Sequence, residues 1–173
     1  MITAVSLFSG CGGSDMGIHQ LGIDVLMAND IIPYARDLYL ANLPETNYLL
    51  EDIRNIQSFP MADLLIGCYP CQGFSQGGIR KADNKINYLY REFARALNTI
   101  TPKAFIVENV NGMLRSNYTH LLEDQIKTFE DAGYNVKYQV LNAAHYGVPQ
   151  LRKRIFIVGI RKDLGVHYVF PTP

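Results

Sequence analysis

A cysteine in the middle of the chain is the side chain best placed for covalent chemistry. Cys71 follows the short apolar run 62–66, which predicts a buried strand, and precedes a polar, glycine-containing stretch, 72–87. The sequence therefore predicts a thiol at the carboxyl edge of a sheet, where open α/β folds bind their ligands. A thiolate in that position could act as a nucleophile, and the polar stretch after it could close over a ligand.

Other roles for the cysteines stay open at this point. Cys68 and Cys71 form a C-x-x-C pair, the spacing of redox and zinc sites. We expect no metal site, because neither Cys11 nor the four scattered histidines supply a second ligand pair at metal-binding spacing. A redox pair of the thioredoxin type would open a helix early in a small fold, whereas this pair precedes a polar stretch in mid-chain. Cysteine is also often a small buried apolar residue, and Cys11 and Cys68 fit that description.

Glycines and two acids indicate a nucleotide-like site in the first third of the chain. A predicted strand, 2–8, runs into the turn 9–14 (Ser-Gly-Cys-Gly-Gly-Ser), and a short helix can follow over 15–21. Glycines let a ligand approach the backbone, and a helix start offers free N–H groups. Asp30 ends the next strand, about 20 residues further on, where a ribose is usually held. Asp52 ends a short extended piece and could accept a hydrogen bond from an adenine amine. A tight turn, a helix cap and a solvated turn are the structural alternatives.

Glu108 is the third candidate acid. It stands where the predicted strand 103–110 leaves the sheet, so it would lie near Cys71 if the two strands are neighbours. A glutamate beside apolar residues can have a raised pKa and can hold or deliver a proton. Capping of the next helix is the alternative.

The most basic short stretch of the chain, 142–154, lies near the C-terminus. Arg152 and Arg154 share a face if this stretch is extended, which suits contacts with anions or phosphates. A cationic surface at the start of a strand is the alternative. His145 stays unassigned, because a histidine there is more often a packing residue than a catalyst.

Composition predicts one soluble domain. Of the 173 residues, 48% are apolar and 18% charged, with no low-complexity tract. Sixteen basic and sixteen acidic residues cancel, so any contact with nucleic acid must come from a local cluster. Three cysteines argue against a disulfide scaffold and for a reducing compartment. With no signal peptide and no apolar run long enough to span a bilayer, we expect a cytoplasmic protein.

Predicted strands and helices alternate, which indicates the α/β class. The strands are 2–8, 24–28, 49–53, 62–66, 103–110, 134–141 and 154–160. The helices are 15–21, 33–41, 88–100 and 118–132.

Four motifs, taken together and in order, resemble the DNA (cytosine-5) methyltransferase family. They are Ser6-Leu-Phe-Ser-Gly-Cys-Gly-Gly13, Pro70-Cys71-Gln72, Glu108-Asn109-Val110 and Gln150-Leu-Arg152-Lys-Arg154. They extend over essentially the whole chain, and they displace the redox interpretation of the C-x-x-C pair. The resemblance implies a Rossmann-like fold that uses S-adenosylmethionine, with a mainly parallel sheet and helices on both faces.

The activity implied by this resemblance is transfer of a methyl group from S-adenosylmethionine to C5 of cytosine in duplex DNA, as in bacterial restriction–modification systems. Cys71 would add to C6 of a base flipped out of the helix, and Glu108, Arg152 and Arg154 would organise that base. The implied cofactor residues are Phe8, Ser9, Gly10, Cys11, Gly12, Gly13, Asp30, Ile31, Asp52, Ile53, Pro70 and Leu89. The implied DNA-contacting residues of the following loop are Gln72, Ser75, Gln76 and Arg80.

The chain departs from the family pattern in two residues and in length. Ser6 stands where the family usually has an aspartate, and Ile31 where it usually has an aromatic residue. The family's target-recognition domain and its two closing motifs are not in this sequence. We therefore expect a catalytic domain over 1–165 and the start of a linker over 166–173. The chain would be a fragment, or one subunit of a split enzyme whose second polypeptide carries the rest, with little sequence-specific activity alone.

Two other interpretations remain at this stage. One is the same chemistry on transfer RNA, and the other is a cofactor-binding or interaction module without catalysis.

Overall fold

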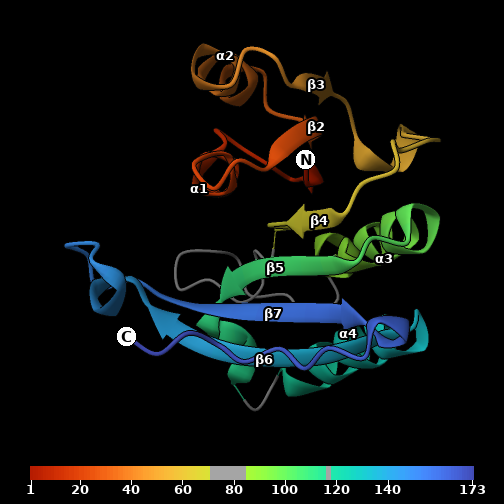
Figure 1. Cartoon of the computed structure of the whole chain (residues 1–173), viewed down its shortest axis with the longest axis vertical. Coiled ribbons are helices and arrows are strands. Elements are labelled where there is room, and N and C mark those ends of the chain that lie inside the picture. The colour runs from red at the N-terminus through yellow and green to blue at the C-terminus, as the bar shows by residue number, and fades with distance from the viewer. Residues whose placement is uncertain (71–84, 116–117) are drawn as a thin grey trace.

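The structure of the protein is a computed structural model that describes residues 1–70, 85–115 and 118–173, with residues 85 and 86 described by their backbone alone. Its centre is a seven-stranded sheet with the order β3-β2-β1-β4-β5-β7-β6 (Figure 1). The strands are β1 (Thr3–Leu7), β2 (Asp24–Asp30), β3 (Asn47–Leu50), β4 (Leu64–Gly67), β5 (Ala104–Val110), β6 (Tyr134–Asn142) and β7 (Lys153–Arg161). β1 to β5 run parallel, and β7 runs antiparallel to both β5 and β6.

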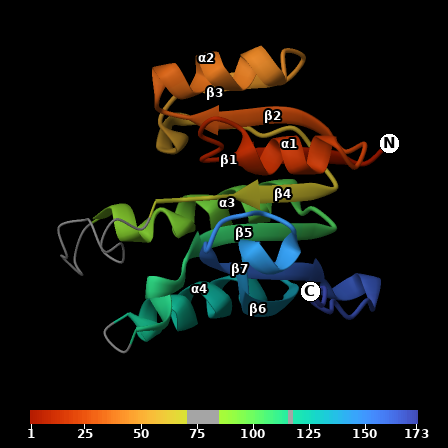
Figure 2. The ribbon, with the colours of Figure 1, turned by 90° about the vertical axis from the view of Figure 1, so that its left-hand side faces the viewer.

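Helices cover both faces of the sheet (Figure 2). They are α1 (Gly13–His19), α2 (Pro33–Asn42), α3 (Tyr90–Ile100) and α4 (Thr119–Asp131). α1 packs on one face, where Ile18 contacts Ala4 and Ile66. α2 packs on the same face, where Tyr39 lies in a cluster with Ala28. α3 and α4 pack on the other face. This arrangement confirms the predicted α/β fold with a mainly parallel sheet.

The larger core lies beneath α3 and α4 and is rich in aromatic rings. α3 is amphipathic, since its apolar residues recur every three or four positions and all face the sheet. Phe93 of α3 is fully buried and makes ring contacts with Phe105 of β5 and Phe129 of α4. Gly159 of β7 faces the Phe105 ring closely, because a Cβ built there would lie 2.0 Å from Phe105 Cε1.

One strand boundary differs from the prediction in a way that matters for the site. Asn29 and Asp30 were expected to follow the second strand, but they are the last two residues of β2. They remain in the sheet because they pair with Leu49 and Leu50 of β3. β3 ends at Leu50, so Asp52 begins the short 3₁₀ segment η1 (Ile53–Asn55) instead of ending a strand.

The parallel strands all end at one edge of the sheet, and this edge gathers the predicted motifs. β1, β2, β4 and β5 reach it at their C-terminal ends, while antiparallel β7 begins there, with Arg154 opposite Val110. The fold therefore brings the first residues of β7 next to the end of β5.

Residues 166–173 run back along β6 (Figure 1). Lys137 Nζ donates to the Tyr168 carbonyl at 2.8 Å, and the Tyr146 hydroxyl donates to the Pro171 carbonyl at 2.9 Å. In the described part of the chain, no helix combines the length and the apolar character needed to cross a membrane.

Candidate active site

A cavity of about 370 Å³ opens at the carboxyl edge, between the ends of β1, β2 and β4. Seven of the residues predicted to bind a cofactor line it: Phe8, Asp30, Ile31, Asp52, Ile53, Pro70 and Leu89. Four further residues complete the wall and were not predicted: Asn29, Ile32, Arg54 and Cys68. The wall combines apolar side chains with two carboxylates, a composition that suits a ligand with an apolar body and a few hydrogen-bond donors.

The glycine turn lies beside this cavity and does not line it. Ser9, Gly10, Cys11, Gly12 and Gly13 connect β1 to the start of α1. The Gly10 amide donates to Asp30 Oδ2 at 2.9 Å, which joins the turn to the wall of the cavity. Gly12 has a φ of 85°, and a Cβ built there would lie 2.8 Å from the ring of Tyr39. Glycine is therefore required at this position both by the backbone and by the close approach of the ring.

Asp30 holds the backbone around it as well as facing the cavity. Its carboxylate accepts hydrogen bonds from the amides of Gly10, at 2.9 Å, Ile31, at 2.7 Å, and Ile32, at 3.1 Å. These contacts turn the chain toward α2, but the N-cap of that helix is Ile32 and no side chain caps it, so the alternative that Asp30 is the cap is wrong. A carboxylate has about four acceptor positions, so one is left for a hydroxyl of a ligand.

Asp52 is the second carboxylate of the cavity. It begins η1 by accepting from the Arg54 amide at 3.0 Å, and it also accepts from the Arg54 guanidinium, with Nε at 2.9 Å. The hydrogen bonds from Arg54 lower the pKa of Asp52 to about 2. The carboxylate is therefore ionised at neutral pH and able to accept a further hydrogen bond.

Phe8 forms part of the wall in a strained conformation. Its φ is 57°, in the left-handed region that non-glycine residues seldom occupy. Its ring meets Tyr69 edge to face, with centroids 6.0 Å apart. Strained backbone of this kind clusters at functional sites.

The two described cysteines have different environments. Cys68 lines the cavity, with its Sγ 3.5 Å from Ser14 Oγ, and burial raises the pKa of its thiol to about 11. Cys11 is exposed, so its interpretation as a buried apolar residue is wrong: the glycine turn projects it into solvent. In residues 1–70, 85–115 and 118–173, no three His, Cys, Asp or Glu side chains come together as a metal site would need.

Glu108 lies between two guanidinium groups. Arg154 Nε is 3.1 Å from Glu108 Oε1, and Arg152 Nη2 is 3.5 Å from the same oxygen. The pairing of β5 with β7 causes this arrangement, because Phe156 lies opposite Glu108 and Arg154 is two residues before it on the same face. The sequence predicted an acid near apolar residues, and the structure places it beside two cations.

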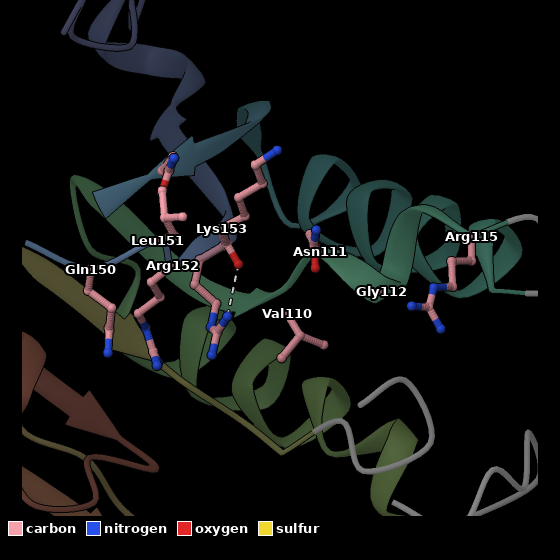
Figure 3. A pocket seen from close by; sticks show the side chains of 10 residues that line it. Val110, Asn111, Gly112, Arg115, Gln150, Leu151, Arg152 and Lys153 are labelled. Carbon is pink, nitrogen blue, oxygen red and sulfur yellow. Dashed lines mark hydrogen bonds between the residues drawn. The ribbon is translucent and has the colours of Figure 1, made fainter. Parts of the chain in front are cut away.

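A second cavity, of about 760 Å³, lies along the start of β7 (Figure 3). Its lining residues are Val110, Asn111, Gly112, Arg115, Asn142, Gln150, Leu151, Arg152, Lys153 and Arg154. Figure 3 shows Gln150 and Arg152 pointing the same way, with the Lys153 side chain turned away from them. Arg154 Nη1 donates to the Lys153 carbonyl at 2.8 Å. Four cationic side chains in one cavity favour an anionic ligand.

Several lining residues of this cavity, among them Asn111, Gly112 and Arg115, were not singled out as site residues from the sequence. Arg115 follows a short 3₁₀ segment, η3 (Asn111–Leu114), whose pattern gave no sign that the chain turns back toward β7. Asn142 ends β6, and its buried Oδ1 has no hydrogen-bond partner among the described residues. Only the packing of β5, β6 and β7 brings these side chains to the cavity.

Cys71, Gln72, Ser75, Gln76 and Arg80 lie outside the described residues. Pro70, the residue before Cys71 in the sequence, lines the first cavity. Asn109 Nδ2 also donates to the Tyr69 carbonyl at 3.2 Å, which ties this segment to β5 beside Glu108.

Comparison with known proteins places the chain among methyltransferases. A family model described as C-5 cytosine-specific DNA methylase matches residues 2–172. The chain is 42% identical, over 98% of its length, to the type II methyltransferase M.FnuDI of Fusobacterium nucleatum, and 36% identical, over 99%, to M.BsuRI of Bacillus subtilis. A crystal structure of a DNA modification methyltransferase candidate encoded within an E. coli prophage superposes with a TM-score of 0.85 at 28% identity, over 98% of this chain.

The chain spans about half the length of these proteins. It covers 50% of M.FnuDI, 46% of M.BsuRI and 49% of the prophage protein.

Proposed function

Because this chain belongs to the C-5 cytosine-specific DNA methylase family, we propose that it is the catalytic part of a bacterial restriction–modification enzyme that methylates C5 of cytosine in duplex DNA. The observation that carries the proposal is the presence of two different cavities at the same edge of the sheet. One is partly apolar with two carboxylates, and the other is cationic and contains the arginines that flank Glu108.

The first cavity fits S-adenosylmethionine, which when bound supplies the methyl group. Asp30 has one acceptor position left for a ribose hydroxyl. Asp52, which is ionised at neutral pH, would accept from the adenine amine. Phe8, Ile53 and Leu89 offer apolar surface to the base. Ser9 to Gly13 would hold the cofactor through backbone contacts beside the cavity.

Cys71 is the proposed nucleophile. Its thiolate would form a bond to C6 of cytosine, and the electron pair of the C5–C6 double bond would move toward C5. C5 would then take the methyl group that S-adenosylmethionine supplies, with S-adenosylhomocysteine left behind. Loss of the C5 proton to a base, followed by cleavage of the S–C6 bond, would restore the ring and free the thiolate. The target must leave the double helix for this to happen, at a cost of a few kcal/mol in lost stacking.

Glu108 and the two arginines would organise the flipped base. Glu108 would face N3 and the exocyclic amine, where a hydrogen bond offsets the charge that develops on the ring. Arg152 and Arg154 hold the Glu108 carboxylate in place, and the cationic cavity would accept the phosphates next to the target. Gln72, Ser75, Gln76 and Arg80 are proposed to contact the DNA. Recognition of the target sequence would come from a further segment or a second polypeptide.

The proposal is tested by measuring transfer of a labelled methyl group to mixed-sequence duplex DNA, with transfer RNA in a parallel reaction. The chain is assayed alone and with the C-terminal half of M.FnuDI supplied in trans. We expect label in DNA when the C-terminal half of M.FnuDI is present and little from the chain alone. We expect none with Cys71→Ser, and a loss of about 10²–10³-fold with Glu108→Gln while cofactor affinity stays the same.

Duplex DNA that carries 5-fluorocytosine tests the covalent step directly. Fluorine at C5 prevents proton loss, so a complex with Cys71 should survive denaturation, and Cys71→Ser should form none. Label in transfer RNA and not in DNA would contradict the proposed substrate. A chain that binds S-adenosylmethionine yet transfers no label in either assay would support a module without catalysis.

A further inference from the structure

A fully buried carboxylate lies beneath the glycine turn, outside both cavities. Asp15, in the first turn of α1, accepts a hydrogen bond from Ser6 Oγ of β1 at 2.7 Å and another from the Tyr39 hydroxyl of α2 at 2.8 Å. Burial raises its pKa, and the two hydrogen bonds oppose that effect. A buried acid is costly to keep unless it has partners, and here one carboxylate links three elements.

Tyr39 connects this carboxylate to the glycine turn. The ring is fully buried, and its Cδ2 lies 2.8 Å from where a Gly12 Cβ would be, so the turn rests directly on the ring. The ring also packs edge to face on Tyr48, with centroids 4.9 Å apart. The Tyr48 hydroxyl donates to the Gly10 carbonyl at 3.3 Å. The position of the Tyr39 ring therefore determines where the turn lies.

The glycine turn also holds Asp30, a residue of the cavity wall. The Gly10 amide donates to Asp30 Oδ2 at 2.9 Å, and Asp30 lines the cavity that fits S-adenosylmethionine. We propose that Asp15 is a positioning residue for the cofactor: by fixing Tyr39 it sets the glycine turn and, through the turn, Asp30. This inference rests on the proposed function, since it concerns the same cofactor.

The two hydrogen-bonded side chains of Ser6 and Asp15 can be exchanged between their positions. Ser6 supplies the hydroxyl from β1, and Asp15 supplies the carboxylate from α1. The two side-chain oxygens are 2.7 Å apart, so an aspartate at position 6 and a serine at position 15 would place a carboxylate and a hydroxyl at the same contact, with the carboxylate reaching the Tyr39 hydroxyl from β1. The double variant Ser6→Asp with Asp15→Ser should therefore restore what Asp15→Asn loses.

The experiment measures the dissociation constants of S-adenosylmethionine and S-adenosylhomocysteine by calorimetry, with thermal melting as a check on folding. We expect Asp15→Asn to weaken both ligands by about tenfold, and the exchanged double variant to recover to within about threefold of wild type. Asp24→Asn, which alters an exposed acid at the start of β2, is the matched control and should leave both constants unchanged.

Tyr39→Phe keeps the ring under Gly12 and removes only its hydroxyl, so it carries the test if Asp15→Asn does not fold. Its expected effect is a loss of about threefold for both ligands. Unchanged affinity in folded Asp15→Asn and Tyr39→Phe would overturn the inference, as would a loss confined to S-adenosylmethionine, which would indicate attraction to the sulfonium charge. Failure of the wild type to bind either ligand would contradict the proposed function instead.

Discussion

Cys68 and Cys11 are the same residue type in two very different environments. The Cys68 side chain lines the first cavity, but burial keeps it protonated, with a pKa of about 11. Cys11, on the exposed side of the glycine turn, meets solvent instead. Since the thiolate is the reactive form, burial and the raised pKa both protect Cys68 from reagents, whereas the Cys11 side chain is accessible to them.

Alkylation with iodoacetamide should therefore discriminate between these two thiols. At pH 8 a thiol of pKa 11 is about 0.1% thiolate, so Cys68 should react far more slowly than Cys11, and its rate should rise as the pH approaches 11. Peptide mass spectrometry of samples quenched at intervals gives both rates. Equal rates at pH 8 would show that Cys68 is not protected by burial.

Several of the residues that sequence reasoning found lie at or near the ends of predicted strands. Asp30 and Glu108 could be placed because parallel strands end at a common edge. Asp15 and Tyr39 could not, because their contact joins residues 24 apart through the packing of α1 on α2. Arg54 was also missed, since its role depends on its bond to Asp52 and not on any pattern in the sequence.

At the scale of elements, β7 is fitted closely to the core. Gly159 leaves room for the Phe105 ring, which in turn packs on Phe129 with centroids 4.9 Å apart. Any side chain at this position would displace buried aromatic rings. The contact therefore couples the strand that carries Arg154 to the core under α4.

Gly159→Ala should lower the free energy of unfolding by about 1–3 kcal/mol, because its Cβ would overlap Phe105. Gly17→Ala in α1 is the matched control, since no atom lies within 4 Å of its built Cβ, and alanine should raise stability there by up to about 1 kcal/mol. Urea unfolding of the three proteins measures both changes. Equal effects from the two substitutions would contradict the close packing of β7.

Element positions were predicted well, and element pairing was not. Apolar runs and helical periodicity located α3, α4 and the central strands to within a few residues. The strand order and the antiparallel direction of β7 follow from long-range hydrogen bonding, which no local pattern encodes. As a result, the ion pairs of Glu108 with Arg152 and Arg154 were not predicted as contacts, although each residue was named.

For the molecule as a whole, buried tyrosines determine the behaviour at high pH. Burial raises the pKa of Tyr134 to about 12, and it raises the pKa of Tyr39 as well. The Tyr134 hydroxyl donates to the Pro102 carbonyl at 2.8 Å, a bond that the phenolate could not make. Above pH 10 the unfolded chain therefore releases protons that the folded chain retains.

Stability should fall as the pH rises from 10 to 12, by up to about 1.4 kcal/mol per pH unit for each such tyrosine. The loss begins at the pKa of the unfolded tyrosine and ends at that of the folded one. Urea unfolding at pH 9, 10 and 11 measures it, and Tyr134→Phe should make the slope shallower. The same slope in wild type and variant would show that Tyr134 does not contribute.

Charge is unevenly distributed although it sums to zero. Sixteen basic residues balance sixteen acidic ones, yet four cations line the cavity at the start of β7, while two carboxylates face the other cavity. The β1–β4 half of the sheet thus carries the acidic cavity, and the β5–β7 half carries the cationic one. Three of the four cations come from the basic stretch 142–154 that the sequence analysis identified.

The left-handed backbone at Phe8 is a strain that the contacts of the phenylalanine ring offset. A bulky residue in that conformation costs roughly 1–2 kcal/mol relative to glycine. Glycine would remove the cost, but it would also remove the ring that forms part of the cavity wall and meets Tyr69. Because the ring also packs against the larger core, its loss would cost more stability than the relief of strain returns, so a laboratory selection for heat resistance would retain phenylalanine at position 8 together with this part of the cavity wall.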